Sequence, residues 1–262
     1  MNVYGIDGNV EKSIELPGIF KGTFREDIVR RALLSEQSRR YQPQAHDVMA
    51  GLRTTAVYVG NYKSYRTGRH MGIAIRPRQR LGGGSMGDVR RIPSATKGRR
   101  AHPHHLEKII EEHINRKEYM LAIKSAIAGC SDSAMIKKGH RIAELSMPIV
   151  VDNKLESISK SKELSSIMDK LGLAKDLEAS HKPRLRKGLR RASNKRHFRN
   201  SVLIVVSDSK HIEKAGRNIP GVDVCSIKQL SIGKLAPGAI PRPSIWTEGA
   251  VHGVEKEVEA RA

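Results

Sequence analysis

Residues 41–105 form a stretch that cannot belong to an ordinary packed core. The stretch contains nine glycines and four prolines, and its apolar residues follow no helical period. It carries twelve lysines and arginines against two aspartates, a net charge of +10. Connections longer than about 12 to 15 residues are uncommon in compact domains and usually have a function or are disordered. We therefore expect a long extended basic loop, inserted into a globular domain made of residues 1–40 and 106–262.

Positive charge is concentrated in this loop and in a second segment, residues 181–199, which we expect at the surface of the domain. The second segment has nine basic side chains and no acid, so the two segments carry +19 of the formal charge of +21. Segments that exclude acids are typical of proteins that bind a polyanion. No apolar run approaches the roughly 18 residues of a membrane span, and no signal-peptide pattern is visible. We expect a cytoplasmic protein that binds nucleic acid and not a membrane.

Four of the six tyrosines lie in the basic loop. Three of them, Tyr58, Tyr62 and Tyr65, stand close in sequence to Lys63 and Arg66. Aromatic rings beside cations that neutralise phosphates suit stacking on unpaired bases. We expect these three tyrosines to stack on bases, with packing back against the protein as the alternative.

The sequence RLGGGSMGDVRR, residues 80–91, matches two catalytic patterns. The residues around Ser85 fit the nucleophile elbow G-x-S-x-G, and the same glycines fit the dinucleotide fingerprint G-x-G-x-x-G. Either motif needs a buried strand before it and a helix after it. Pro77 and the three arginines within residues 76–80 exclude the buried strand, and Pro93 follows too soon for the helix. We expect neither chemistry, but a glycine loop whose backbone can approach phosphates closely.

The remaining residues alternate between strand and helix patterns. Asp7-Gly8 between two short apolar runs predicts a hairpin. The spacing of apolar residues predicts helices over 26–40, 115–129 and 161–173, the second capped by Asn115. Continuous apolar runs predict buried strands at 147–151, 201–207, 222–227 and 244–246. This alternation predicts an α/β fold, a mostly parallel sheet with helices on both faces in Rossmann-like layers, whose strand order the pattern leaves open.

Other candidates for chemistry are expected to be structural. Cys130 and Cys225 stand in separate apolar neighbourhoods without metal or disulfide spacing, so both are expected to be reduced core cysteines. The three histidines of residues 102–105 lack further ligands at zinc spacing. Residues 207–209, Ser-Asp-Ser, follow a strand pattern where α/β enzymes place site residues, but a cap or turn before the next helix is the simpler interpretation. We expect no enzyme, cofactor, metal or small-molecule substrate.

Several separated motifs carry a family resemblance. In the domain they are KGHRI (138–142), PIVV (148–151), GRNIPGV (216–222), LAPG (235–238) and IWTE (245–248), and in the loop they are TGR (67–69), PR (77–78) and GGG (82–84). In this order the motifs resemble the large-subunit ribosomal protein four family, in its archaeal and eukaryotic form, from the N-terminus to about residue 250. The short segment after Glu248 is similar to archaeal-type members.

The resemblance implies a structural constituent of the large ribosomal subunit that binds its RNA and supports its assembly. In this family the long loop penetrates the RNA and helps line the tunnel through which the nascent peptide leaves. The implied partners are large-subunit ribosomal RNA, neighbouring large-subunit ribosomal proteins and the nascent peptide. The implied RNA-binding residues are Arg53, Lys63, Arg66, Arg69, Arg76, Arg78, Arg80, Arg90, Arg91, Lys97, Arg99, Arg100, Lys182, Arg184, Arg186, Lys187, Arg190, Arg191, Lys195, Arg196 and Arg199. The implied loop tip near the tunnel is Gly82, Gly83, Gly84, Ser85 and Met86.

Two other functions remain open at this point. One is a nucleic-acid-modifying enzyme with a Rossmann-like core, against which stands the lack of a glycine-rich turn after the strand patterns at 147–151 and 201–207. The other is a free regulatory RNA-binding protein, because a protein shaped for ribosomal RNA can also bind a messenger that mimics it.

Overall fold

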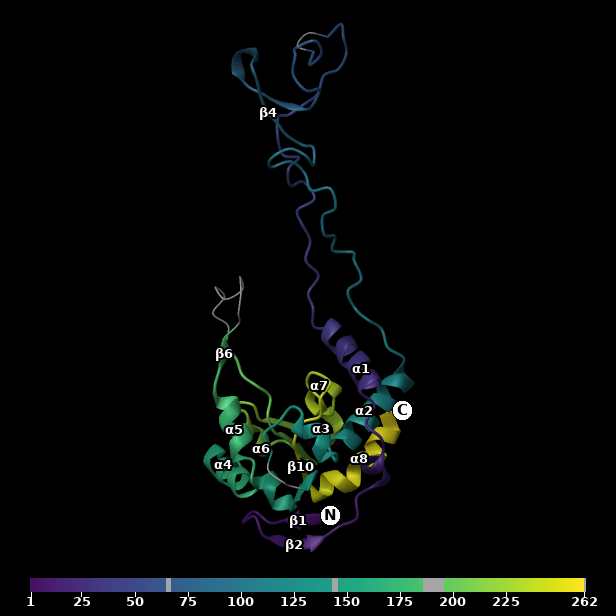
Figure 1. The fold of residues 1–262 in the computed structure, drawn as a ribbon, viewed down its shortest axis with the longest axis vertical. Helices are drawn as coiled ribbons and strands as arrows, with labels where there is room; N and C mark the ends of the chain where they lie inside the picture. Colours follow the sequence, from purple (N-terminus) through teal and green to yellow (C-terminus); the bar gives the residue numbers. More distant parts are fainter. Residues whose placement is uncertain (65–66, 143–145, 186–195, 262) are drawn as a thin grey trace. The chain divides into compact units, whose positions relative to one another are not determined.

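The chain folds into two compact units in the computed structural model, which describes residues 1–262 except 65–66, 143–145, 186–195 and 262 (Figure 1). Met1–Arg40 and Glu111–Ala262 form the first, called the globular unit below. Tyr41–Ile110 form the second, called the arm below.

A six-stranded sheet forms the centre of the globular unit, with the order β2-β1-β5-β10-β8-β9. The strands are β1 Asn2–Tyr4, β2 Val10–Ser13, β5 Ile149–Val151, β8 Leu203–Val206, β9 Asp223–Ser226 and β10 Ser244–Thr247. β1 and β2 form the predicted antiparallel hairpin, and every other pair of neighbours is parallel. The predicted α/β class and mostly parallel sheet are confirmed. β10, the last strand along the chain, lies between β5 and β8.

Helices follow most of the strands. They are α1 Glu26–Ser38, α2 Arg116–Gly129, α3 Ser133–Lys137, α4 Ser161–Lys170, α5 Ala174–His181, α6 Ile212–Gly216, α7 Ile232–Leu235 and α8 Glu248–Arg261. Short 3-10 turns occur at η1 Gly18–Lys21, η3 Asn153–Ser157 and η5 Ile227–Gln229. α2 begins after the predicted cap, since the Asn115 side chain accepts a hydrogen bond from the Lys117 N–H at 3.1 Å. α4 ends at Lys170, and Gly172 follows its cap with a φ of +81°, the left-handed conformation that glycine allows.

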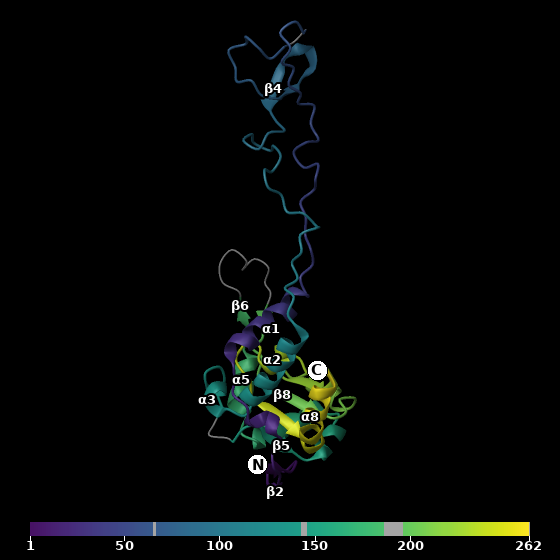
Figure 2. The same ribbon diagram turned by 90° about the vertical axis from the view of Figure 1, so that its right-hand side faces the viewer.

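The central strands bury alternate residues in two hydrophobic clusters. Val150, Val205 and Trp246 belong to one cluster, to which α1, α2, α7 and α8 contribute. Ile204 and Ile245 belong to the other, together with residues of α4, α5 and α6. The two views in Figures 1 and 2 show these two sets of helices around the sheet. Strands buried on both faces need apolar residues at successive positions, which explains the unbroken runs in the sequence.

Both cysteines are buried and unpaired, as predicted. Burial raises the pKa of Cys130 to about 12 and that of Cys225 to about 11, so both remain thiols at neutral pH. The two cysteines are far apart in the sequence, but the fold brings both into one hydrophobic cluster, where the charge of Arg242 partly offsets the increase in pKa that burial causes. Arg242 is completely buried, and its Nη2 lies 2.7 Å from Asp223 Oδ2.

The arm contains little regular structure. β3 Arg78–Arg80 and β4 Met86–Val89 pair antiparallel, and the 3-10 turn η2 Gly82–Gly84 connects them. Among the described residues of the arm, Ala56 alone is buried. The arm therefore has almost no hydrophobic core of its own.

Candidate nucleic-acid interface

The β3–β4 hairpin contains the glycine motif that resembled a catalytic site. Arg78 pairs with Val89 and Arg80 with Met86, and Val57 forms one further bridge to Arg78. The sequence missed this strand, although it was right that no buried strand leads into Ser85. A two-stranded ladder leaves both faces open, so arginines can stay solvated, and Pro77 precedes the strand, where its missing N–H costs nothing.

The glycine triplet forms the turn of this hairpin and not a strand-to-helix elbow. Gly83 has a φ of +70° and Gly84 a φ of +89°, a backbone conformation that glycine adopts without strain. The exposed Ser85 hydroxyl donates to the Gly82 carbonyl at 3.3 Å. No histidine or carboxylate among the described residues is hydrogen-bonded to it, so nothing activates it as a nucleophile.

Replacing Ser85 with alanine is expected to leave the RNA binding that the resemblance implies unchanged, because the substitution removes only one exposed hydrogen bond inside the turn. Filter binding to a ribosomal RNA fragment measures the affinity of the variant and of the parent chain. A large loss of affinity, or of incorporation into the large subunit, would contradict this assignment of Ser85.

Basic side chains outnumber their protein partners in the arm. Asp47 pairs with Arg53 at 2.6 Å, and Asp88 pairs with Arg90 at 3.1 Å. Arg76, Arg78 and Arg91 donate to neutral oxygens of the arm. Exposed cations whose side chains have no hydrogen bond or ion pair among the described residues are Lys63, Arg69, Arg80, Lys97, Arg99, Arg100 and Lys108. These seven cations are available for an external polyanion.

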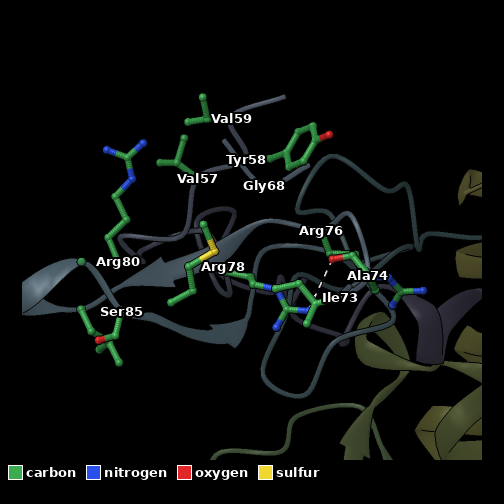
Figure 3. Close-up of a pocket in the computed structure, with 13 residues that line it drawn as sticks. Val57, Tyr58, Val59, Gly68, Ile73, Ala74, Arg76, Arg78, Arg80 and Ser85 are labelled. Atoms are coloured by element: carbon green, nitrogen blue, oxygen red, sulfur yellow. Dashed lines mark hydrogen bonds between the residues drawn. The ribbon is translucent and has the colours of Figure 1, made fainter. Parts of the chain in front are cut away.

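The tyrosines of the arm lie partly against its own backbone. The Tyr58 ring packs on two glycines, since a Cβ at Gly60 would lie 2.7 Å from the ring and one at Gly68 would lie 3.4 Å from it. Tyr58 also lines a small pocket of about 40 Å³ beside the hairpin, shown in Figure 3. Tyr62 is 67% exposed and meets His70 edge-on at 5.4 Å. Tyr65 and Arg66 lie outside the described residues.

The second basic segment lies between α5 and β8. β6 Arg184–Leu185 and β7 Arg196–His197 pair antiparallel, and Lys182 is exposed. Arg186, Lys187, Arg190, Arg191 and Lys195 lie outside the described residues, as do the side chains of Arg184 and Arg196.

Asp176 of α5 connects this segment to the KGHRI motif. Its buried carboxylate accepts hydrogen bonds from His140 Nδ1 at 3.0 Å, the Arg141 N–H at 2.9 Å and the Ser201 hydroxyl at 2.5 Å. Arg199 Nη2 lies 3.5 Å from the same carboxylate and donates to the Gly139 carbonyl. Burial opposes ionisation of Asp176, but the hydrogen bonds from His140, Ser201 and the Arg141 backbone hold its pKa well below the usual range.

Sequence reasoning missed Asp176, although a signal was present. Leu173, Asp176, Leu177 and Ser180 recur at helical spacing, and all four are buried. An acid on the apolar stripe of a helix indicates a buried carboxylate that needs partners.

The carboxyl ends of β8 and β10, where α/β enzymes bind ligands, are occupied by the protein's own carboxylate. Glu156 accepts hydrogen bonds from the Ser207 N–H at 2.8 Å, the Asp208 N–H at 3.2 Å and the Thr247 hydroxyl at 2.7 Å. Asp208 accepts from the Lys210 N–H at 3.2 Å, which is the predicted turn before α6. Glu156 thus takes the donors that a phosphate would need at this edge.

Metal sites and membrane spans each need a particular arrangement of side chains. Nowhere in the described part of the chain do three His, Cys, Asp or Glu side chains converge as a metal site would require. None of the helices in those ranges combines the length and the apolar character needed to cross a membrane.

An α/β unit with an acid-free basic segment and an arm in which cations outnumber acids belongs to the class of polyanion-binding proteins. Residues 14–257 match the model of the ribosomal protein L4/L1 family, and the chain belongs to this family. The resemblance found in the sequence is thereby confirmed.

Curated relatives agree over nearly the whole chain, and the three that follow are named large ribosomal subunit protein uL4. The protein from Methanocaldococcus jannaschii is 36% identical over 98% of both chains. The protein from Methanococcoides burtonii is 38% identical over 97% of both, and that from Archaeoglobus fulgidus 36% identical over 95% of both. These relatives are archaeal, as the sequence predicted.

Proposed function

We propose that the chain is a structural constituent of the large ribosomal subunit that binds large-subunit ribosomal RNA through its arm and through residues 181–199. Family membership and the names of the archaeal relatives support the assignment to this subunit. The observation that carries the mode of binding is the set of exposed arm cations that have no partner among the described residues.

The mechanism is electrostatic and needs no catalysis. Arginine forks bridge phosphates that would otherwise repel each other where RNA helices converge. Each neutralised phosphate releases condensed counterions, so the affinity falls steeply as salt rises. Ala56 is the single buried residue in the described part of the arm, so the arm has no core that could stabilise its conformation. Contacts with RNA stabilise that conformation instead.

The finer assignments follow from the family. The globular unit is a Rossmann-like layered domain. This assignment is supported by the two hydrophobic clusters, to each of which the strands of the sheet contribute side chains. Residues 41–105 are the RNA-penetrating loop, and the hairpin turn from Gly82 to Met86 is its tip near the exit tunnel. Neighbouring ribosomal proteins and the nascent peptide are further partners, the latter at the tip.

Salt-dependent binding tests this function with two RNAs and two chains. A structured fragment of large-subunit ribosomal RNA and a plain RNA duplex of equal length are titrated with the intact chain and with a chain that lacks residues 66–92. The intact chain is expected to prefer the structured fragment, and the deletion is expected to lower the salt slope by roughly 0.7 to 0.9 for each phosphate that is no longer neutralised.

Equal affinity of the intact chain for the two RNAs would contradict the proposal. The basic segments would then act as a nonspecific arm, and the enzyme and regulator hypotheses would return. Trp246, the single tryptophan and completely buried, reports through its fluorescence that the shortened chain keeps a folded globular unit.

A further inference from the structure

A groove in the globular unit brings together motifs that are far apart in the sequence. Its volume is about 490 Å³, which is in the range of about 300 to 1,000 Å³ found for ligand sites. The end of α1 forms one wall, His140 of the KGHRI motif and Arg199 a second, and the LAPG turn after α7 a third. Apart from Arg199, none of the residues that line this groove belongs to the RNA contacts proposed for the arm and for residues 181–199.

Part of the groove is held rigidly by internal hydrogen bonds. Glu36 accepts from the Ile232 N–H at 3.0 Å and the Gly233 N–H at 2.9 Å, and the Tyr119 hydroxyl donates to the same carboxylate. Asp176 likewise holds His140 and Arg199, which also line the groove. The Glu36 carboxylate is thus already hydrogen-bonded within the protein, and these internal contacts form part of the groove before any ligand binds.

Other polar groups of the groove are free to meet a ligand. The side chains of Gln37, Arg40 and Asn200 make no hydrogen bond or ion pair within the described ranges, and all three are half-buried or exposed. An amide presents both donors and an acceptor, the groups that read the edge of a base. Arg40 adds a cation that can meet a phosphate or stack on a base.

The remaining lining is apolar and suits a flat ring. Leu33 of α1 is buried, and Pro237 of the LAPG motif and Ile240 just after this motif also line the groove. A Cβ at Gly139 would lie 3.0 Å from an Ile240 methyl, so the glycine lets this side chain lie directly against the KGHRI backbone. Apolar walls with a few convergent polar groups are typical of a pocket for an unstacked base.

We propose that this groove binds one unpaired nucleotide of large-subunit ribosomal RNA, an inference that rests on the proposed function. The base lies between the apolar walls with its edge on Gln37 and Asn200, and a flanking phosphate meets Arg40. The charge of the surroundings favours RNA over a protein partner, because Arg199 ends the acid-free segment 181–199.

Short oligonucleotides test this site by separating the base from the phosphates. Four RNA pentanucleotides that differ in the central base, and a fifth with an abasic central residue, are bound to the full chain in a fluorescence anisotropy assay. At least one central base is expected to raise the affinity about 5-fold to 100-fold over the abasic probe, the usual effect of stacking one base. The double variant Gln37→Ala, Asn200→Ala, which removes both amides that read the base edge, is expected to lower that ratio and to remove the differences in affinity between the four bases.

Two matched variants control for the rest of the molecule. Arg30→Ala removes one cation from α1 outside the groove, and Tyr62→Ala removes the most exposed described tyrosine of the arm. Arg30→Ala is expected to keep the ratio between base and abasic probes, whereas Tyr62→Ala shows whether stacking in the arm, instead of the groove, sets that ratio. Ratios near one for all four bases in the parent chain, or a ratio lost in Tyr62→Ala but kept in the double variant, would overturn the proposal. Neither outcome would change the preference for structured ribosomal RNA that the proposed function predicts. The pentanucleotide experiment therefore tests the groove, and the salt-dependence experiment tests the proposed function independently.

Discussion

Replacing Asp176 with alanine is expected to lower the free energy of unfolding of the globular unit by about 3 to 5 kcal/mol, the usual cost of removing one partner of a buried ion pair. The carboxylate is completely buried and accepts from His140, Ser201 and the Arg141 backbone, all of which would lose their acceptor. Urea unfolding followed by Trp246 fluorescence measures the change.

The variant Asp176→Asn removes the charge of this side chain but keeps its size and shape, so it measures the contribution of the charge to stability. The folded-state pKa of Asp176 lies below the unfolded value of about 3.9, so its ionisation stabilises the fold above about pH 4, and this contribution is lost as the pH falls further. The stability advantage of the parent chain over Asp176→Asn should therefore be present at pH 6 and shrink below pH 4. A constant difference down to pH 2, or an alanine variant as stable as the parent, would contradict this role of Asp176.

The fold class followed from the sequence because burial on both faces leaves a direct mark. Runs such as those at 147–151 and 201–207 are apolar at nearly every position, as strands between two clusters must be. Strand order leaves no such mark, since β10 would show the same pattern at any position inside the sheet. Its place between β5 and β8 depends on long-range pairing that local patterns do not encode.

Sequence patterns did not predict which charged side chains are buried, for a related reason. Arg242 and Asp176 are buried and Glu36 is half-buried, although these residue types normally face solvent, so composition alone assigns them to the surface. Each is held by partners far away in the chain, such as Asp223 for Arg242 and the α7 backbone for Glu36. Asp176 stood on a helical apolar stripe that indicated its burial, and Glu36 likewise continues the stripe of Val29, Ala32 and Leu33 in α1.

The arm was predicted because its sequence lacks the apolar pattern of a core. Such an absence does not indicate the local structure, so the hairpin and the packing of Tyr58 were not predicted. A high glycine and arginine content indicates that no core holds the segment, which agrees with a single buried residue, Ala56, among the described ones. The same composition is compatible with an exposed hairpin, because a two-stranded ladder needs no buried face. The packing of Tyr58 on glycines likewise leaves no periodic pattern.

Replacing Arg80, Arg99 and Arg100 with alanine is expected to lower the salt slope of RNA binding by roughly 2 to 3, from about 0.7 to 0.9 for each phosphate contact. These three side chains are exposed, and none has a hydrogen bond or an ion pair in the part of the chain that the structure describes. Binding to a structured ribosomal RNA fragment over a series of salt concentrations measures the slope and the loss of affinity.

A matched triple variant shows whether contacts or total charge cause the effect. Arg25, Arg30 and Arg31 lie at the start of α1, and each is within 3.4 Å of a carboxylate of the protein. Their replacement changes the net charge by the same amount, but removes cations whose charge the protein already balances. A much smaller change of slope is therefore expected. Equal slopes for the two triples would mean that overall charge governs binding, and the arm would lose its assignment as the surface that contacts phosphates.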